Sequence, residues 1–256
     1  MSTEYFVDKH SIVRQIWGRS DTILFIFAGG AAEFALNKAV DWLYFTGRLP
    51  ADPLGRLFST VKYSQTIMFS EKQAALRAID AITNIHARVE AKRGTTIPDW
   101  AYRDVLFLLI DYSIRSFEVL NRNLTLAEKN EVFNVFNSVG LRMRLNGLPA
   151  SHEAWIIMRQ QHLRQNLQYS PFTADLYTQY KKHLGVVRYE ILLQAQTLVT
   201  PRQVQELLHL KRASLFQWIV ALYKVSKKVK VDWLLRALIL PKKYKKEIET
   251  LDRTIV

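Results

Sequence analysis

The stretch KQAALRAIDAITNIHARVEAK, residues 72–92, has the pattern of one long amphipathic helix. Its apolar residues recur at spacings of three and four, which is the period of an α-helix. Ser70 stands before it as the expected N-cap, and Gly94 follows it as the expected end. The residues that share its apolar face are Leu76, Ile79, Ile82, His86 and Val89. We therefore predict a helix over 72–92 that carries a histidine on its apolar stripe.

The segments that follow this stretch also have helical periodicity. A predicted helix over 100–120 is apolar on nearly every side at 105–110, which is typical of a central, buried helix. Thr125 with Glu128 three residues later forms a capping-box pattern, which predicts the start of the next helix. Ser151 is the expected cap of the helix after that.

The carboxyl-terminal half continues with helices that are separated by breaks. A break at 183–185 separates a helix that contains Tyr177 and Tyr180 from a helix over 187–198. Pro201 opens a last predicted helix. Its apolar residues are Leu207, Leu210, Leu215, Trp218 and Leu222. The chain has only 9 glycines and 7 prolines, and no segment alternates with a period of two, so we predict an all-α fold without a sheet.

The most apolar stretch of the chain is TILFIFAGGAAEFAL, residues 22–36. Glu33 and the nearby Lys38 and Asp41 interrupt it before it reaches the roughly 20 apolar residues that a membrane span needs. We therefore expect a buried core helix, with the pair Gly29 and Gly30 at a close helix contact. The first residues lack the pattern of a signal peptide, and this favours a cytoplasmic protein.

The chain is basic, with 36 lysine and arginine residues against 23 acidic residues and a net charge of +13. From 202 to 256 there are 13 basic and 5 acidic residues, a net charge of +8. We divide the chain into a helical domain over 1–225 and a basic, helical extension over 226–256. The extension is either a solvated terminus or a peripheral contact surface for an anionic membrane. No nucleic-acid-binding motif is present, so we expect no nucleic-acid partner.

Several common classes of site are excluded by the residues that the chain lacks. It contains no cysteine, which excludes disulfides, thiolate metal sites and cysteine nucleophiles. It contains no HExxH, no GxSxG and no glycine-rich phosphate loop. The sequence therefore points to none of the cofactor-independent enzyme classes that these motifs mark.

His86 is the candidate functional residue, because an imidazole on an apolar helix face loses its solvation and needs a partner. One solution is a hydrogen bond to a neighbouring side chain or carbonyl. The other is an axial bond to iron in an apolar haem pocket, as in other all-α haem proteins. The position alone leaves both solutions open.

A second candidate cluster lies upstream, where Pro53 and the expected cap Asp52 begin a helix. Arg56 and Thr60 are four residues apart and therefore share one face of that helix. A guanidinium and a hydroxyl on one face suit an anion such as a haem propionate. The alternative is a surface arginine beside an ordinary helical threonine.

The motif DPLGRLFST at 52–60, with IHARV at 85–89, resembles the catalytic domain of rubber oxygenases (latex-clearing proteins) and of the related mpaB-type oxygenases. The likeness is continuous from about Leu36 to about Leu120. A weaker likeness extends through NLTLAEK at 123–129 to about Leu198.

The resemblance implies a globin-like helical fold that holds haem b. His86 would be the axial ligand of the iron, and Arg56 and Thr60 would lie against the haem near its propionates. Asp111 resembles a retained position of the family, whereas Ser59 stands where rubber oxygenases carry a lysine. No catalytic residue is assigned.

The reaction that the resemblance implies is oxidation of a hydrophobic substrate by dioxygen. The substrate would be an isoprenoid, a polyprenyl chain or an unsaturated lipid, attacked at an alkene carbon–carbon bond. Two alternatives stay open at this point: a haem-binding carrier or sensor without oxygenase activity, and a basic helical adaptor at a membrane surface.

Overall fold

Two long helices, α2 (Ser20–Leu36) and α7 (Asp99–Leu120), pack against each other at the centre of the computed structural model, which describes residues 4–47, 51–211 and 252. Gly29 allows their close approach, because a Cβ atom there would lie 2.3 Å from the ring of Tyr112. The expected close contact at the glycine pair is thus confirmed at Gly29. The predicted burial of both helices is also confirmed.

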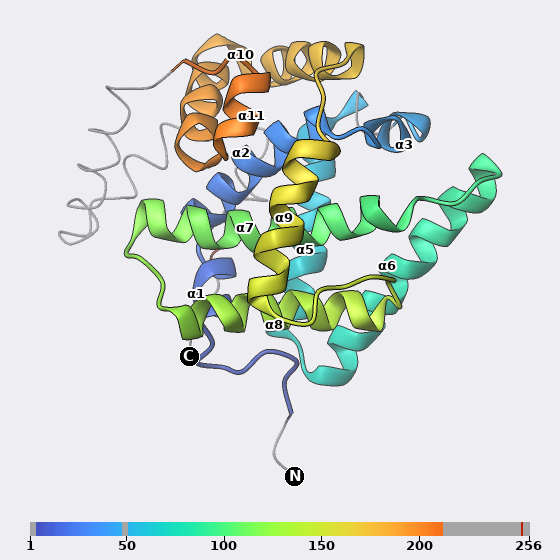
Figure 1. Cartoon of the computed structure of the whole chain (residues 1–256), viewed down its shortest axis with the longest axis vertical. Coiled ribbons are helices and arrows are strands. Elements are labelled where there is room, and N and C mark those ends of the chain that lie inside the picture. Colours follow the sequence, from blue (N-terminus) through green and yellow to red (C-terminus); the bar gives the residue numbers. More distant parts are fainter. Residues whose placement is uncertain (1–3, 48–50, 212–251, 253–256) are drawn as a thin grey trace.

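The other described helices surround this pair (Figure 1). They are α1 (Ile12–Trp17), α3 (Val40–Phe45), α5 (Pro53–Phe69), α6 (Lys72–Arg93), α8 (Leu126–Arg142), α9 (His152–Gln165), α10 (Pro171–Val199) and α11 (Arg202–Leu207). Figure 1 shows α7 and α8 running alongside each other, with α9 crossing in front of both. The apolar side chains of eight of the described helices, α1, α2 and α5 to α10, meet in one core.

Several helices begin where the sequence predicts, and the caps explain why. The side chain of Asp52 accepts a hydrogen bond from the amide of Gly55 at the start of α5. Thr125 and Glu128 form the predicted capping box of α8, and Ser151 caps α9. These short polar side chains satisfy amide groups that have no partner inside the helix.

Two expected helix boundaries were wrong. Ser70 is the C-cap of α5, and the N-cap of α6 is Glu71, because α5 runs on to within two residues of α6. α11 ends at Leu207, so Leu210 lies beyond it, after His209 has turned the backbone to a φ of 52°. Leu215, Trp218 and Leu222 of that predicted helix lie outside the described residues.

The described residues form a single all-α domain with no strand, and only isolated bridges occur among them. The predicted break before residue 187 is a kink inside α10, where Gly185 has a φ of 73°. The globin-like order of helices around a haem stays a prediction.

Most of the basic extension predicted over 226–256 lies outside the described residues. The exception is Asp252, whose carboxylate accepts hydrogen bonds of 2.8 Å and 3.0 Å from the amide and hydroxyl of Ser20 at the start of α2. None of the described helices has the combination of length and hydropathy that a membrane span requires.

Candidate functional site

A carboxylate near the end of α6 fixes the turn that leads from α6 to α7. Gly94 ends α6 in the left-handed conformation, with a φ of 73°, which glycine adopts without strain. Oε1 of Glu90 then accepts hydrogen bonds from the amide of Ile97 at 2.8 Å and from the hydroxyl of Tyr102 at 3.0 Å. This one oxygen therefore holds the loop and the first turn of α7 against α6.

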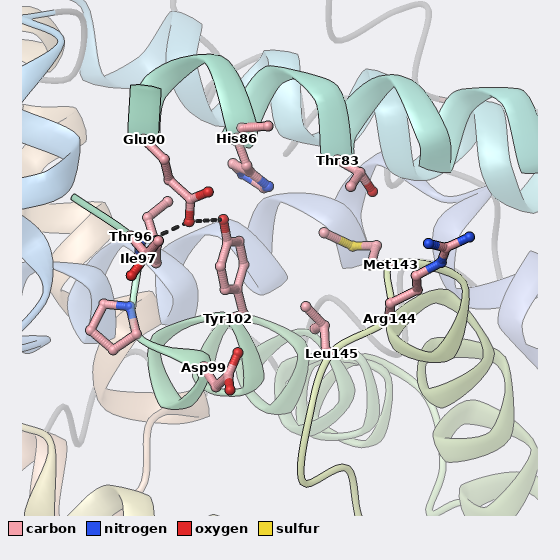
Figure 2. A pocket seen from close by; sticks show the side chains of 12 residues that line it. Thr83, His86, Glu90, Thr96, Ile97, Asp99, Tyr102, Met143, Arg144 and Leu145 are labelled. Carbon is pink, nitrogen blue, oxygen red and sulfur yellow. Dashed lines mark hydrogen bonds between the residues drawn. The ribbon is translucent and has the colours of Figure 1, made fainter. Parts of the chain in front are cut away.

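A pocket of about 430 Å³ opens between α6, this loop, the first turn of α7 and the turn after α8 (Figure 2). It is lined by Thr83, His86, Ala87, Glu90, Thr96, Ile97, Pro98, Asp99, Tyr102, Met143, Arg144 and Leu145. The volume is in the range of sites that bind small molecules or cofactors.

The imidazole of His86 points from α6 into this pocket, toward Tyr102 (Figure 2). The two rings meet edge to face, with their centroids 5.2 Å apart and an interplanar angle of 67°. Nδ1 of His86 is buried, and within the described residues it has no hydrogen-bond partner. The hydrogen-bonded core histidine that the sequence left open is therefore not seen in the described part of the chain.

His86 is held as a neutral imidazole. Burial lowers its pKa below the ordinary value of 6.5, and the positive charge of Arg56 lowers it further, while Glu90 opposes this in part. A neutral imidazole has a lone pair on one ring nitrogen, which is what metal ligation requires.

Arg56 and Thr60 do share one face of α5, as the spacing predicts. Nη1 of Arg56 donates to Oγ1 of Thr60 at 2.9 Å and to Oγ of Ser59 at 3.2 Å. Both hydroxyls also lie against the carbonyl oxygen of Arg56, at 2.7 Å for Ser59 and 3.3 Å for Thr60. Ser59 thus helps Thr60 to fix the arginine side chain.

The structure brings Arg56 close to His86 but leaves the arginine outside the pocket wall. Helices α5 and α6 pack against each other, and Arg56 is near enough to lower the pKa of His86. Neither Arg56 nor Thr60 lines the pocket. The three predicted residues therefore form one neighbourhood, in which only His86 faces the cavity.

Sequence reasoning missed a buried ionic cluster between α2, α7 and α9, formed by Glu33, Asp104, Asp111, Arg159 and His162. The Arg159 side chain is 3% exposed and that of Glu33 is fully buried. The guanidinium contacts both carboxylate oxygens of Glu33 and lies 3.0 Å from Oδ2 of Asp111. The hydroxyl of Tyr112 donates to Glu33 at 2.8 Å.

His162 extends this cluster through both of its ring nitrogens. Nε2 lies 2.9 Å from Oε1 of Glu33, and Nδ1 makes an ion-pair contact of 2.7 Å with Oδ2 of Asp104 that is not an aligned hydrogen bond. Burial lowers the pKa of His162, but Asp104 and Glu33 outweigh it, so the pKa is raised. The two carboxylates therefore stabilise the protonated imidazole.

The signal for this cluster was visible in the sequence, since Glu33 interrupts the most apolar stretch and Asp111 follows the apolar run of α7. A charged side chain inside a buried helix requires a partner of opposite charge. The partners were hidden because Arg159 and His162 lie more than 120 residues from Glu33 along the chain.

Within the described ranges, no three His, Asp or Glu side chains are arranged to hold a metal ion.

Compared with known protein families, residues 14–225 match the family described as ER-bound oxygenase mpaB/B'/Rubber oxygenase, catalytic domain. No curated protein and no solved structure matches the chain.

Proposed function

Since this chain belongs to the family of mpaB and rubber oxygenase catalytic domains and is therefore an oxygenase, we propose that it uses haem b and that His86 is the axial ligand of the iron. The observation that carries the proposal is an imidazole that points into a pocket of about 430 Å³ and whose buried Nδ1 has no hydrogen-bond partner among the described residues. The family suggests a hydrophobic substrate and dioxygen as the reactants.

The chemistry of His86 fits a haem ligand. A buried polar nitrogen without a partner is costly, and a bond to iron would remove the need for a hydrogen bond. The lowered pKa keeps the ring neutral at neutral pH, so no proton competes with the metal. The edge-to-face contact with Tyr102 restricts rotation of the imidazole and so favours one orientation.

The walls of the pocket fit the same group. Ala87, Ile97, Met143 and Leu145 supply apolar surface on which a flat macrocycle could pack. Haem b, when bound, supplies the dioxygen chemistry, and the protein supplies the ligand, the orientation and the apolar surroundings.

Arg56 and Thr60 of α5 support the proposed cofactor site from outside the pocket wall. Arg56 maintains a positive charge near His86, which favours the neutral imidazole. The hydroxyls of Thr60 and Ser59 hold the guanidinium in place. The resemblance would put this pair near the haem propionates; since neither residue lines the pocket, we propose that the pair acts from behind the pocket wall, through its positive charge.

The proposed substrate is an isoprenoid or another unsaturated lipid-like chain, oxidised at a carbon–carbon double bond. The family supports this choice through its oxygenase members.

The test is an absorption spectrum of the purified protein, before and after addition of haemin, beside His86→Ala and His10→Ala. His10 is exposed and lies in another part of the chain, so its variant controls for non-specific haem binding to histidine. We expect a Soret band in the parent and in His10→Ala, and a lost or shifted band in His86→Ala. A parent protein that stays colourless after reconstitution would contradict the haem proposal.

A further inference from the structure

Three charged side chains line the His86 pocket: Glu90, Asp99 and Arg144. The two acidic ones are already engaged, since Glu90 accepts hydrogen bonds from Ile97 and Tyr102, and Asp99 accepts one from Nδ2 of the Asn146 side chain at 3.0 Å. The guanidinium of Arg144 makes no hydrogen bond and no ion pair with any residue in the described part of the chain. The pocket therefore presents one positive charge that is available to a ligand.

The backbone at Arg144 is one that arginine seldom adopts. α8 ends in a turn in which the amide of Leu145 bonds to the carbonyl of Gly140 and the amide of Arg144 bonds to that of Leu141. Arg144 occupies the left-handed position of this turn, with a φ of 58°, where glycine is usual. Strained residues of this kind are concentrated at functional sites. Here the unusual conformation carries a long cationic side chain along the pocket wall.

Asp80 of α6 does not neutralise Arg144. Both oxygens of Asp80 are bound by the neighbouring Arg142, at 2.8 Å and 2.6 Å. Arg142 has the larger effect in lowering the pKa of Asp80. Arg144 adds only a weaker electrostatic attraction to that carboxylate. Two arginines thus share one carboxylate, and this end of the pocket keeps a net positive charge.

Arg144 and Glu90 lie at opposite ends of the pocket. Figure 2 shows Glu90 at one end and Arg144 at the other, with His86 between them. A ligand that bonds to His86 and carries a carboxylate at its edge therefore finds attraction in one direction and repulsion in the other.

We propose that Arg144 pairs with a propionate of the haem and so sets the orientation of the macrocycle in the pocket. This inference rests on the proposed function. Arg56 is bonded to Ser59 and Thr60 and does not line the pocket, whereas Arg144 does. A guanidinium matches the two oxygens of a carboxylate and keeps its charge at any physiological pH.

The test measures haem affinity rather than activity. Haemin and haemin dimethyl ester, which lacks the propionate charges, are titrated into the full chain and followed at the Soret band. We compare the parent with Arg144→Gln, which keeps the length of the side chain, and Arg144→Lys, which keeps its charge. Arg88→Gln is the matched control, since Arg88 is an exposed arginine on α6 that does not line the pocket.

Arg144→Gln should bind haemin about fivefold more weakly than the parent, as expected for one partly exposed ion pair. It should bind the dimethyl ester as the parent does, and Arg144→Lys should retain most of the haemin affinity. The difference should shrink at high salt, because the pair is accessible to counterions. Arg88→Gln should match the parent with both ligands.

Three outcomes would overturn the inference, and they can be told apart. If Arg144→Gln binds haemin as the parent does while His86→Ala loses the Soret band, the haem proposal stands and the role of Arg144 falls. If no variant binds haem, both fall together. Equal weakening of haemin and its ester in Arg144→Gln would indicate damage to the fold, and it would also count against a charge pairing.

Discussion

Replacement of Arg159 by methionine removes the guanidinium from the buried ionic cluster and keeps an unbranched side chain of similar length. Glu33 would then lose contacts to both of its carboxylate oxygens, and Asp111 would lose one of its two arginine partners. Both carboxylates are buried, so water cannot replace the lost bonds without local opening of the structure.

The size of the effect follows from the pKa of Glu33. Burial by itself would raise this pKa, but Arg159 and then His162 outweigh burial and lower it from 4.5 to about 2. A difference of this size corresponds to about 3 kcal/mol of stabilisation at neutral pH. Loss of one partner of a buried ion pair costs about 3–5 kcal/mol in general, so the two figures agree.

The pH dependence of stability gives a second, independent test of the role of Arg159. In the parent, Glu33 stabilises the fold above its ordinary pKa of 4.5, and this is lost as the pH falls toward about 2. In Arg159→Met, burial would dominate and raise the pKa of Glu33, so protonation would then relieve the buried charge. The difference in stability between variant and parent should therefore narrow as the pH falls below about 5.

Urea unfolding followed by circular dichroism, at neutral pH and at low pH, measures the loss of stability in Arg159→Met and its change with pH. Arg202→Met is the matched control, because it breaks an exposed arginine–glutamate pair and should leave the urea midpoint unchanged. Glu33→Gln combined with Arg159→Met removes both charges and should recover much of the lost stability. The reasoning would be refuted if Arg159→Met lost less than about 1 kcal/mol of its free energy of unfolding at neutral pH. It would also be refuted if the difference in this free energy between variant and parent grew at low pH.

Three further perturbations test other parts of the structure. Gly29→Ala should destabilise the protein by about 1–3 kcal/mol, because its Cβ would lie 2.3 Å from the Tyr112 ring. Gly30→Ala should be neutral or stabilising, because its Cβ would lie 3.8 Å from the nearest side chain. Equal melting temperatures of the two variants would contradict this. Because the pKa of His162 is raised, its protonated ring stabilises the fold below its ordinary pKa of 6.5, and this stabilisation is lost as the pH rises above 6.5. The melting temperature of His162→Gln should lack this fall with rising pH, and an unchanged pH profile would count against the reasoning. Removal of residues 226–256 should abolish binding to anionic vesicles at low salt, as their basic character predicts, and unchanged co-sedimentation would rule out this membrane contact.

The helices were predictable because their signals are local. The capping box at Thr125 and the caps at Asp52 and Ser151 lie within three residues of the amides that they satisfy. Where two helices compete for the same connecting residues, the local signal failed, as at Ser70, which ends α5 instead of starting α6. Propensity does not say which of two neighbouring helices claims a polar residue at their junction.

The candidate site was predictable only in part, because it joins one helix to distant turns. The stripe on α6 singled out His86, and the i, i+4 spacing placed Arg56 beside Thr60. Nothing in the periodicity indicated Arg144, because its place in the pocket depends on the turn after α8 and on how α8 packs against α6.

The sequence by itself determined the all-α class, the apolar stripes and the family resemblance, because helix period, caps and motifs are properties of neighbouring residues. Only the tertiary structure decided which charges meet. Glu33 finds Arg159 and His162 across the core, and His86 finds a pocket whose available cation comes from beyond α8. Electrostatic pairing acts over a few ångströms in space, and the chain order does not record which residues folding brings within that distance.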